Sequence, residues 1–187
     1  MNIGVLALQG AFVEHEKILK KLNIPYTEIR QKKDLKNIDG LILPGGESTV
    51  QGKLLRKFDL FTEIQMKIES GLPVLATCAG LILLAENIEN DAEIHLSTLP
   101  VRVKRNAYGR QLGSFETLGS VGEIDDFPMV FIRAPYITGL SCDVKILAEI
   151  DSHIVGVKYK NQIGLAFHPE MTEDFRIHQA FVNLCKA

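Results

Sequence analysis

Cys78 stands in a sequence context that suits a nucleophile. The segment Ala76-Thr77-Cys78-Ala79-Gly80 follows an apolar run and has small residues two before, one after and two after the cysteine. Small residues allow the sharp strand-to-helix turn of a nucleophile elbow, which larger side chains would block. A thiol at a helix N-terminus also lies at the positive end of the helix dipole, which favours the thiolate. The segment therefore predicts a reactive cysteine, and the alternative is a buried structural thiol.

A cysteine that attacks a carboxamide needs a general acid and base, normally a histidine oriented by a carboxylate. His168 comes directly after the apolar run 163–167 and before Pro169 and Glu170. It is therefore expected at a strand end, where the active sites of α/β sheets gather. Pro169 disfavours helix at His168, and in an extended chain residues 168 and 170 share a face. Glu170 is predicted to fix the imidazole tautomer; the alternative for His168 is a solvated turn.

The remaining histidines and cysteines lack such a setting. The histidines lie beside polar or surface-patterned segments, so we expect them to have no role in the chemistry. The cysteines are widely spaced and form no Cys-x-x-Cys, so neither a disulfide framework nor a metal site is predicted. These residues are His15, His95, His153, His178, Cys142 and Cys185.

The glycine pair in Pro44-Gly45-Gly46 follows another apolar run and could turn main-chain N–H groups into a site. A tetrahedral intermediate needs such donors for its oxyanion, each worth roughly 100- to 1000-fold in rate. A phosphate-binding loop is excluded because five residues, not four, separate Gly46 from Gly52, and Leu54 occupies the required Ser/Thr position. The loop is predicted to hold the oxyanion, with a plain turn as the alternative.

The elements that position these residues indicate an α/β fold. Short runs rich in Val, Ile and Leu alternate with helix-period segments through the first half, which is typical of a parallel sheet covered by helices. In that half we expect strands at 3–8, 25–29, 40–44 and 73–77, and helices at 12–22, 49–69 and 81–85. The second half is expected to form mixed or antiparallel sheet, with strands at 101–103, 129–132, 144–150, 154–159 and 163–167, and a last helix at 174–185. No linker or repeat divides residues 1–187, so one domain is expected.

Composition excludes several classes of protein. The 187 residues are 46% apolar, enough for one substantial core. The 21 basic and 23 acidic residues give a net charge of −2 without a long basic run, which argues against binding nucleic acid or an anionic membrane. No apolar stretch approaches about 18 residues, and the start lacks a signal-peptide pattern. We expect a cytoplasmic protein.

The cysteine elbow, the Pro-Gly-Gly loop and His168-Pro169-Glu170 together resemble the triad-type class I glutamine amidotransferases. Ala76 departs from the usual Gly-x-Cys-x-Gly elbow, but alanine is still small. The resemblance is more specific to one branch, the glutaminase subunits of pyridoxal phosphate synthases. Six segments resemble that branch in order along nearly the whole chain: 6–12, 43–49, 77–81, 105–111 with 114–116, 131–135 and 167–170.

The resemblance implies a flavodoxin-like three-layer sandwich. Its central sheet would be mostly parallel with helices on both faces, and additional antiparallel strands would lie in the second half. Cys78 would be the nucleophile, His168 the general base and then acid, and Glu170 the orienting carboxylate. The oxyanion donors would be Gly46 and Ala79. The implied glutamine-binding residues are Gly46, Glu47, Ser48, Arg105, Ile132 and Arg133.

Elementary chemistry is consistent with these implied roles. Free glutamine carries an α-carboxylate, which Arg105 or Arg133 could bind as a fixed cation. Gln9, at the end of the first expected strand, could lend an amide donor near the oxyanion or contact a partner. No cofactor or metal is needed to hydrolyse L-glutamine to glutamate and ammonia.

Ammonia released by such a site needs an acceptor. A chain filled by the glutaminase fold leaves no room for an acceptor domain, so we expect another polypeptide to receive the ammonia. The resemblance implies that this partner is the synthase subunit, which makes pyridoxal 5′-phosphate from a pentose phosphate, a triose phosphate and ammonia. Because glycines allow a peptide to flip, the loop at Gly45 and Gly46 also predicts that the partner activates the glutaminase.

Three alternatives remain. The glutaminase subunit of imidazole glycerol phosphate synthase shares the triad logic, but segments 9–12 and 105–111 speak against it. A cysteine peptidase or deglycase on a related sheet fits the His168-Pro169-Glu170 segment and the separate glycine loop less well. A catalytically silent regulatory subunit would not be expected to keep Cys78, His168 and Glu170.

Overall fold

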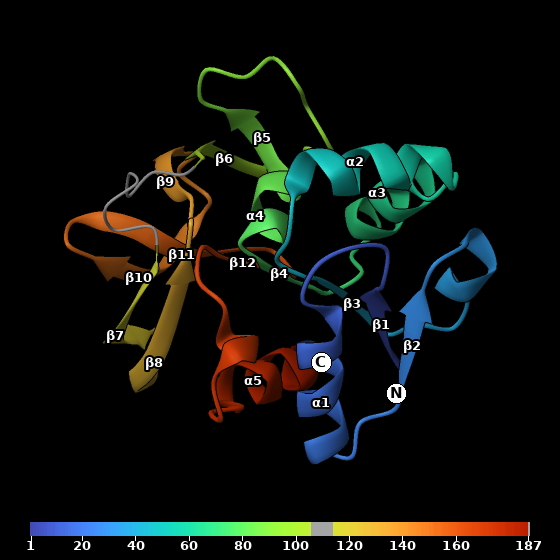
Figure 1. The fold of residues 1–187 in the computed structure, drawn as a ribbon, viewed down its shortest axis with the longest axis horizontal. Coiled ribbons are helices and arrows are strands. Elements are labelled where there is room, and N and C mark those ends of the chain that lie inside the picture. The colour runs from blue at the N-terminus through green and yellow to red at the C-terminus, as the bar shows by residue number, and fades with distance from the viewer. Residues whose placement is uncertain (106–113, 187) are drawn as a thin grey trace.

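Strands and helices alternate along the first half of the chain (Figure 1). The structure, a computed structural model, describes residues 1–105 and 114–186. Its first half contains β1 (Ile3–Leu6), α1 (Phe12–Lys21), β2 (Tyr26–Ile29), a 3₁₀ turn at Lys32–Leu35, β3 (Gly40–Leu43), α2 (Ser48–Lys57), α3 (Phe61–Glu69), β4 (Val74–Thr77) and α4 (Ala79–Leu84). The second half contains β5 (Ala85–Ile88), β6 (Leu99–Lys104), β7 (Ser114–Val121), β8 (Ile124–Ile132), β9 (Tyr136–Leu140), β10 (Lys145–Ile150), β11 (His153–Tyr159), β12 (Gln162–Leu165) and α5 (Arg176–Leu184).

The central sheet has the strand order of a flavodoxin-like fold. Within the described residues, ten strands form one sheet in the order β2-β1-β3-β4-β12-β11-β9-β6-β5, with β10 paired to β11. The first five strands of that order are parallel to their neighbours. Taken alone they follow the 2-1-3-4-5 order of the doubly wound fold. Antiparallel pairing begins at β12–β11 and continues through β9 to β6, while β7 and β8 form a separate antiparallel pair. The expected fold class is confirmed.

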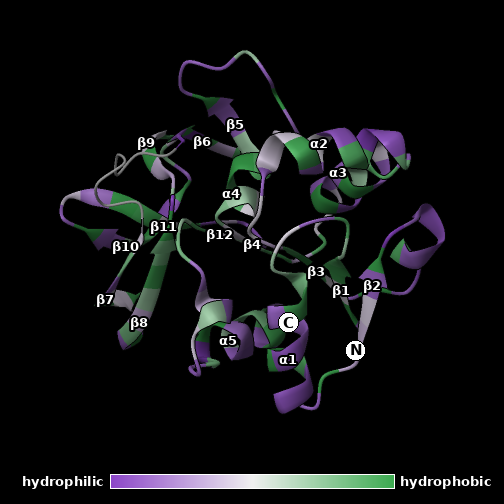
Figure 2. Cartoon of the chain, viewed as in Figure 1, coloured by the Kyte–Doolittle hydropathy of each residue, from purple (hydrophilic) through white to green (hydrophobic). Residues whose placement is uncertain are grey.

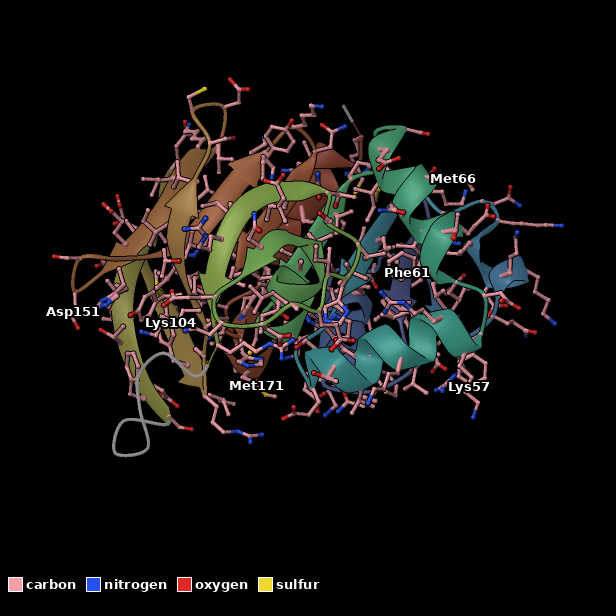
Figure 3. The ribbon with its side chains drawn as sticks, turned by 90° about the horizontal axis from the view of Figure 1, so that it is seen from above. Lys57, Phe61, Met66, Lys104, Asp151 and Met171 are labelled. Carbon is pink, nitrogen blue, oxygen red and sulfur yellow. The ribbon has the colours of Figure 1, made fainter. Side chains whose placement is uncertain are left out.

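Helices cover both faces of the parallel strands. Figure 1 shows α2 and α3 on one face and α1 and α5 on the other. Viewed from above, α2 and α3, where Lys57, Phe61 and Met66 are labelled, lie at one end of the molecule (Figure 3). The β-rich second half, with Lys104 and Asp151, lies at the opposite end. None of the helices in the described ranges is long and apolar enough to cross a membrane.

The core lies between the central strands and these helices. Strands β1, β3, β4 and β12 are buried along their whole length, and Figure 2 shows the hydrophobic colour on β1 and β3, with hydrophilic residues along the helices. Strands covered on both faces read as continuous apolar runs, which explains why the sequence marks them clearly. Their carboxyl ends meet at one edge, where residues 7–11, 44–48, 78 and 166–168 follow them.

Several element boundaries differ from the sequence prediction. The stretch 49–69, expected to be one helix, is two helices that break at Asp59, whose φ is +55°. Aspartate adopts this left-handed conformation more readily than most residues, so no glycine or proline marks the break. Strands β5, β7 and β9 were not predicted. β7 alternates exposed and half-buried residues and is rich in Ser, Thr and Gly, so its apolar signal is weak.

Candidate active site

Cys78 occupies a strained turn between β4 and α4. Its backbone angles are φ +47° and ψ −99°, a conformation rare for a residue with a side chain. Its N–H donates to the Leu165 carbonyl oxygen of β12 at 2.8 Å. A Cβ atom at Gly80 would lie 2.1 Å from the Leu43 carbonyl oxygen, so this position accepts only glycine. The turn directs the thiol toward the end of β8, where Sγ lies 4.0 Å from the Ile132 carbonyl oxygen.

His168 and Glu170 form a buried pair just beyond β12. The His168 Nδ1 atom lies 2.7 Å from Glu170 Oε1, and both side chains are buried. The expected extended strand does not continue here, because Pro169–Met171 forms a 3₁₀ turn with proline at its first position. This turn, rather than strand alternation, brings the carboxylate back against the imidazole. The main-chain N–H of His168 donates to the Val130 carbonyl oxygen at 2.8 Å and connects the turn to β8.

Electrostatics around this pair favour an imidazolium beside a carboxylate. Burial lowers the pKa of His168, but its contacts with Cys78 and Glu170 raise it more, to about 10. Burial likewise raises the pKa of Glu170, but His15 and His168 outweigh it and hold the pKa below its usual value. Histidine with a pKa near 10 is protonated at neutral pH, so His168 can give a proton to a leaving group.

Thr77, on the elbow, connects the pair to the glycine loop. The Thr77 hydroxyl accepts the Gly45 N–H at 3.0 Å and donates to Glu170 Oε1 at 3.3 Å. On the other side of the loop, the Gly45 carbonyl oxygen accepts the Ala11 N–H at 3.0 Å. The loop is thus fastened to β4 and to the start of α1.

Gln9 fastens the next residues of the loop. Its side-chain Oε1 accepts the main-chain N–H of Glu47 at 2.9 Å, and its main-chain carbonyl oxygen accepts an N–H of Gln51 Nε2 at 2.9 Å. Gly46 has φ +157°, and a Cβ there would lie 2.5 Å from Gln9 Oε1. Gln9 therefore holds the loop as a hydrogen-bond acceptor, and the two roles expected for it, an amide donor near the oxyanion or a contact with a partner, stay predictions.

Most of the predicted residues line one pocket of about 310 Å³, a volume at the lower end of small-molecule sites. Of the residues expected to act on or bind the substrate, Glu170 lies behind His168 and Ala79 begins α4, outside this lining. The segment 106–111 lies outside the described residues. The pocket is lined by Gln9, Ala11, Gly45, Gly46, Glu47, Ser48, Thr49, Cys78, Ile82, Arg105, Ile132, Arg133 and His168.

Two arginines bring positive charge to this pocket. Arg105 pairs with Asp91 at 2.8 Å through Nη1, while among the described residues its buried Nε and Nη2 atoms have no hydrogen-bond partner. An arginine side chain at a pocket wall is suited to bind a carboxylate. Arg133 is more exposed and pairs with Glu47 at 3.3 Å at the pocket wall. Arg105 is therefore the better-placed cation for an anionic ligand.

The expectation that His15, His95 and His178 belong to surface-patterned segments is wrong. All three are buried, and His15 lies 3.5 Å from the second oxygen of Glu170. On α1, His15 follows Phe12 by three residues and precedes Leu19 by four, so it shares their buried face. Its glutamate neighbours at 14 and 16 hid this periodicity. Only His153 is partly exposed, where it packs against Tyr136.

A cysteine on a strand-to-helix elbow with a buried histidine–carboxylate pair beside it defines the arrangement of cysteine hydrolases with a catalytic triad. The chain belongs to the SNO glutamine amidotransferase family, whose family model matches residues 5–187.

Individual relatives agree with this family. A protein of Desulfitobacterium hafniense (strain DSM 10664 / DCB-2), named "Pyridoxal 5'-phosphate synthase subunit PdxT", is 61% identical over 98% of this chain and 92% of its own length. A protein of the same name from Streptococcus pneumoniae (strain CGSP14) is 50% identical over 100% of this chain and 98% of its own. A solved structure titled "Crystal structure of glutamine amidotransferase" is 42% identical and superposes with a TM-score of 0.95, covering 99% of both chains.

Proposed function

We propose that this chain hydrolyses L-glutamine to glutamate and ammonia and delivers the ammonia to a pyridoxal 5′-phosphate synthase subunit. The observation that carries the proposal is the His168–Glu170 pair, 2.7 Å apart, beside the Cys78 elbow in a pocket that also contains Arg105. The relatives named as synthase subunits at 50% and 61% identity support the choice of partner.

In the proposed reaction Cys78 is the nucleophile. Its thiolate sulfur attacks the side-chain carboxamide carbon of glutamine, and the C=O electrons move to oxygen to form a tetrahedral oxyanion. Main-chain N–H groups of Gly46 and Ala79 stabilise this oxyanion. When the C–N bond breaks, the His168 imidazolium protonates the nitrogen, so ammonia leaves and a γ-glutamyl thioester remains.

Water completes the cycle. The now neutral His168 removes a proton from a water molecule, whose oxygen attacks the thioester carbon. The C–S bond then breaks, glutamate leaves, and the thiolate–imidazolium pair is restored. Glu170 remains ionised throughout and stabilises the imidazolium. The cycle consumes one water and needs neither metal nor cofactor.

The substrate is held by its amino-acid end. The α-carboxylate of glutamine pairs with the Arg105 guanidinium, and Glu47 accepts from the α-ammonium group. Ser48, Ile132 and Arg133 line the same pocket and bound the rest of the substrate. This arrangement selects a free amino acid, because a peptide-bonded glutamine lacks both charges.

The proposal extends to the organisation of the protein. Residues 1–187 form one glutaminase domain, and the synthase subunit is a separate polypeptide that docks over the carboxyl ends of the parallel strands. The protein acts in the cytoplasm, because a reactive cysteine and two further free cysteines suit a reducing compartment.

A titration tests the proposal. Glutamate release by the purified chain is measured alone and with increasing amounts of its cognate synthase subunit, with sizing chromatography in parallel. We expect weak or no activity alone and strong activation that saturates with complex formation. Full activity of the isolated chain, unchanged by the synthase, or activation by an imidazole glycerol phosphate synthase cyclase instead, would overturn the assignment.

A further inference from the structure

Two buried histidines from different helices continue the hydrogen-bonded chain behind Glu170. His15 of α1 and His178 of α5 both have zero exposed surface. His15 Nδ1 lies 2.8 Å from His178 Nε2, and His15 Nε2 lies 3.5 Å from Glu170 Oε2 and 3.3 Å from Thr77 Oγ1. The proposed reaction uses neither histidine. Burying a polar side chain costs free energy unless its polar atoms are hydrogen-bonded, so this pair needs an explanation.

The second oxygen of Glu170 lacks a donor. Oε1 receives His168 Nδ1 at 2.7 Å and the Thr77 hydroxyl at 3.3 Å. Oε2 is buried, and among the residues described it has no hydrogen-bond partner. His15 Nε2 lies 3.5 Å from it. A small approach would give this carboxylate oxygen the charge-assisted bond that burial demands.

The geometry selects one arrangement of protons. If His178 Nε2–H donates to His15 Nδ1, then His15 carries its own proton on Nε2 and faces Glu170 Oε2 and Thr77 as a donor. The only atom left over is His178 Nδ1, which has no partner in the described part of the chain and would be a bare acceptor. In the opposite arrangement His15 Nδ1–H donates to His178 Nε2. A lone pair of His15 then faces the carboxylate, and the Nδ1–H of His178 is buried without an acceptor. Both features cost more free energy than a bare acceptor does.

We propose that His15 is a positioning residue for Glu170, holding the carboxylate through Nε2–H while His178 fixes that tautomer from α5. This inference rests on the proposed function, because the proposed reaction is what gives Glu170 its orienting role. When His15 holds Oε2, Oε1 is directed at His168. The contacts then connect His178 of α5 to His15 of α1, and His15 to Glu170 beside the elbow. Thr77 adds the glycine loop to the same network through Gly45.

The charged groups around His15 are consistent with a neutral donor. Glu170 and His168 face it from the segment after β12, His178 from α5, and Glu14 from α1 itself. Burial lowers the pKa of His15 more strongly than the nearby carboxylates raise it. The ring therefore stays neutral, which leaves the tautomer as the decisive property.

Two substitutions separate donation from packing. His15→Leu removes the donor but fills the space, whereas His15→Gln can present an amide N–H near the position of Nε2. With the synthase subunit present, His15→Leu is expected to lower kcat about 10- to 100-fold, by analogy with the loss of a residue that orients a metal-binding histidine or carboxylate. KM should change little, since His15 does not line the pocket. The acid limb of the pH profile should move to higher pH, because Glu170 loses a donor to its ionised form. His15→Gln should restore most of both properties, and His153→Leu, on β11 and outside the pocket lining, serves as the control and should change neither.

A spectroscopic measurement on the wild-type chain keeps the inference independent of activity. Ring ¹⁵N shifts, assigned by the loss of signals in His15→Gln, should report a neutral His15 protonated on Nε2 between about pH 6 and 8. A ring protonated on Nδ1, a charged ring, or a folded His15→Leu variant with wild-type kcat and pH profile would overturn the inference. A wild-type complex with no glutaminase activity would instead refute the proposed function, while the ¹⁵N spectrum would still decide the tautomer.

Discussion

Glu170→Gln removes one negative charge from the triad and keeps the shape of the side chain. In the native protein, Glu170 Oε1 lies 2.7 Å from His168 Nδ1, with both side chains buried. The introduced amide is neutral, so the imidazolium of His168 loses its nearest buried counter-charge. We expect the pKa of His168 to fall from about 10 toward its ordinary value of 6.5.

The size of the effect follows from this pKa and from the donor pattern. The rise from 6.5 to about 10 represents roughly 5 kcal/mol in favour of the imidazolium, to which Cys78 and Glu170 both contribute against burial. Losing about half of it makes the imidazolium on the order of 100-fold less stable relative to the neutral ring, which moves the basic limb of activity to lower pH, while the loss of the orienting carboxylate lowers kcat itself. The amide NH₂ must also face either His168 or His15, both of which donate here, so a wrong tautomer can extend the loss toward about 10⁴-fold.

The assay is glutamate release with saturating synthase subunit between about pH 5 and 10, combined with NMR titration of His168. In the wild type His168 is protonated below its pKa and loses the proton as the pH rises through about 10, so activity that needs the imidazolium falls only there. In Glu170→Gln this basic limb should move to lower pH, and kcat should fall about 10²- to 10⁴-fold. Glu173→Gln, which alters an exposed carboxylate paired with Lys21, is the matched control. A variant with kcat within about tenfold of the wild type and an unchanged His168 pKa would refute the reasoning.

Three further substitutions test other parts of the site. Cys78→Ala should abolish glutaminase activity, and a glutamine-analogue electrophile should label only Cys78 by peptide mass spectrometry. Cys142→Ala and Cys185→Ala should stay active, because Cys142 lies outside the pocket and burial raises the pKa of Cys185 to about 12; label on either would contradict the assignment. His168→Asn should lower kcat by roughly 10³-fold or more in the steady-state assay, and near-normal turnover would remove His168 from the mechanism. Gly46→Val should abolish activity, because even its Cβ would lie 2.5 Å from Gln9 Oε1, the atom that holds the loop. The variant should still assemble with the synthase subunit on a sizing column, and an active variant would show that the loop tolerates this bulk.

The sequence was most informative where the site is built from contiguous residues. The elbow at 76–80, the glycine loop at 44–46 and the His168–Glu170 segment each carry their geometry locally, in small residues or a proline. The parallel sheet then brings these three segments together, because β3, β4 and β12 are neighbours and end at the same edge. Four short, fully buried apolar strands are hard to mistake, and the fold class could be predicted from them.

Contacts made between helices could not be predicted in the same way. His15 and His178 meet only because α1 and α5 pack side by side on one face of the sheet (Figure 1). The two histidines are 163 positions apart in the chain, and the sequence between them carries no signal of that contact. The position of His15 on the apolar face of α1 was readable in principle, but Glu14 and Glu16 gave its surroundings a charged character. Glu16 is itself buried, so charge was a poor guide to exposure on this helix.

The strained backbone of Cys78 makes the position of the thiol depend on the packing of the hydrophobic core. A residue held at φ +47° and ψ −99° costs about 1–3 kcal/mol and persists only when its surroundings enforce it. Here β12 enforces it by accepting the Cys78 N–H at Leu165, and β3 enforces it because the Leu43 carbonyl lies against Gly80. Both strands are buried along their whole length, so the packing that stabilises the sheet also holds the thiol at the pocket. Substitutions that loosen β3 or β12 should therefore relax the elbow and reduce turnover even where the chain remains folded.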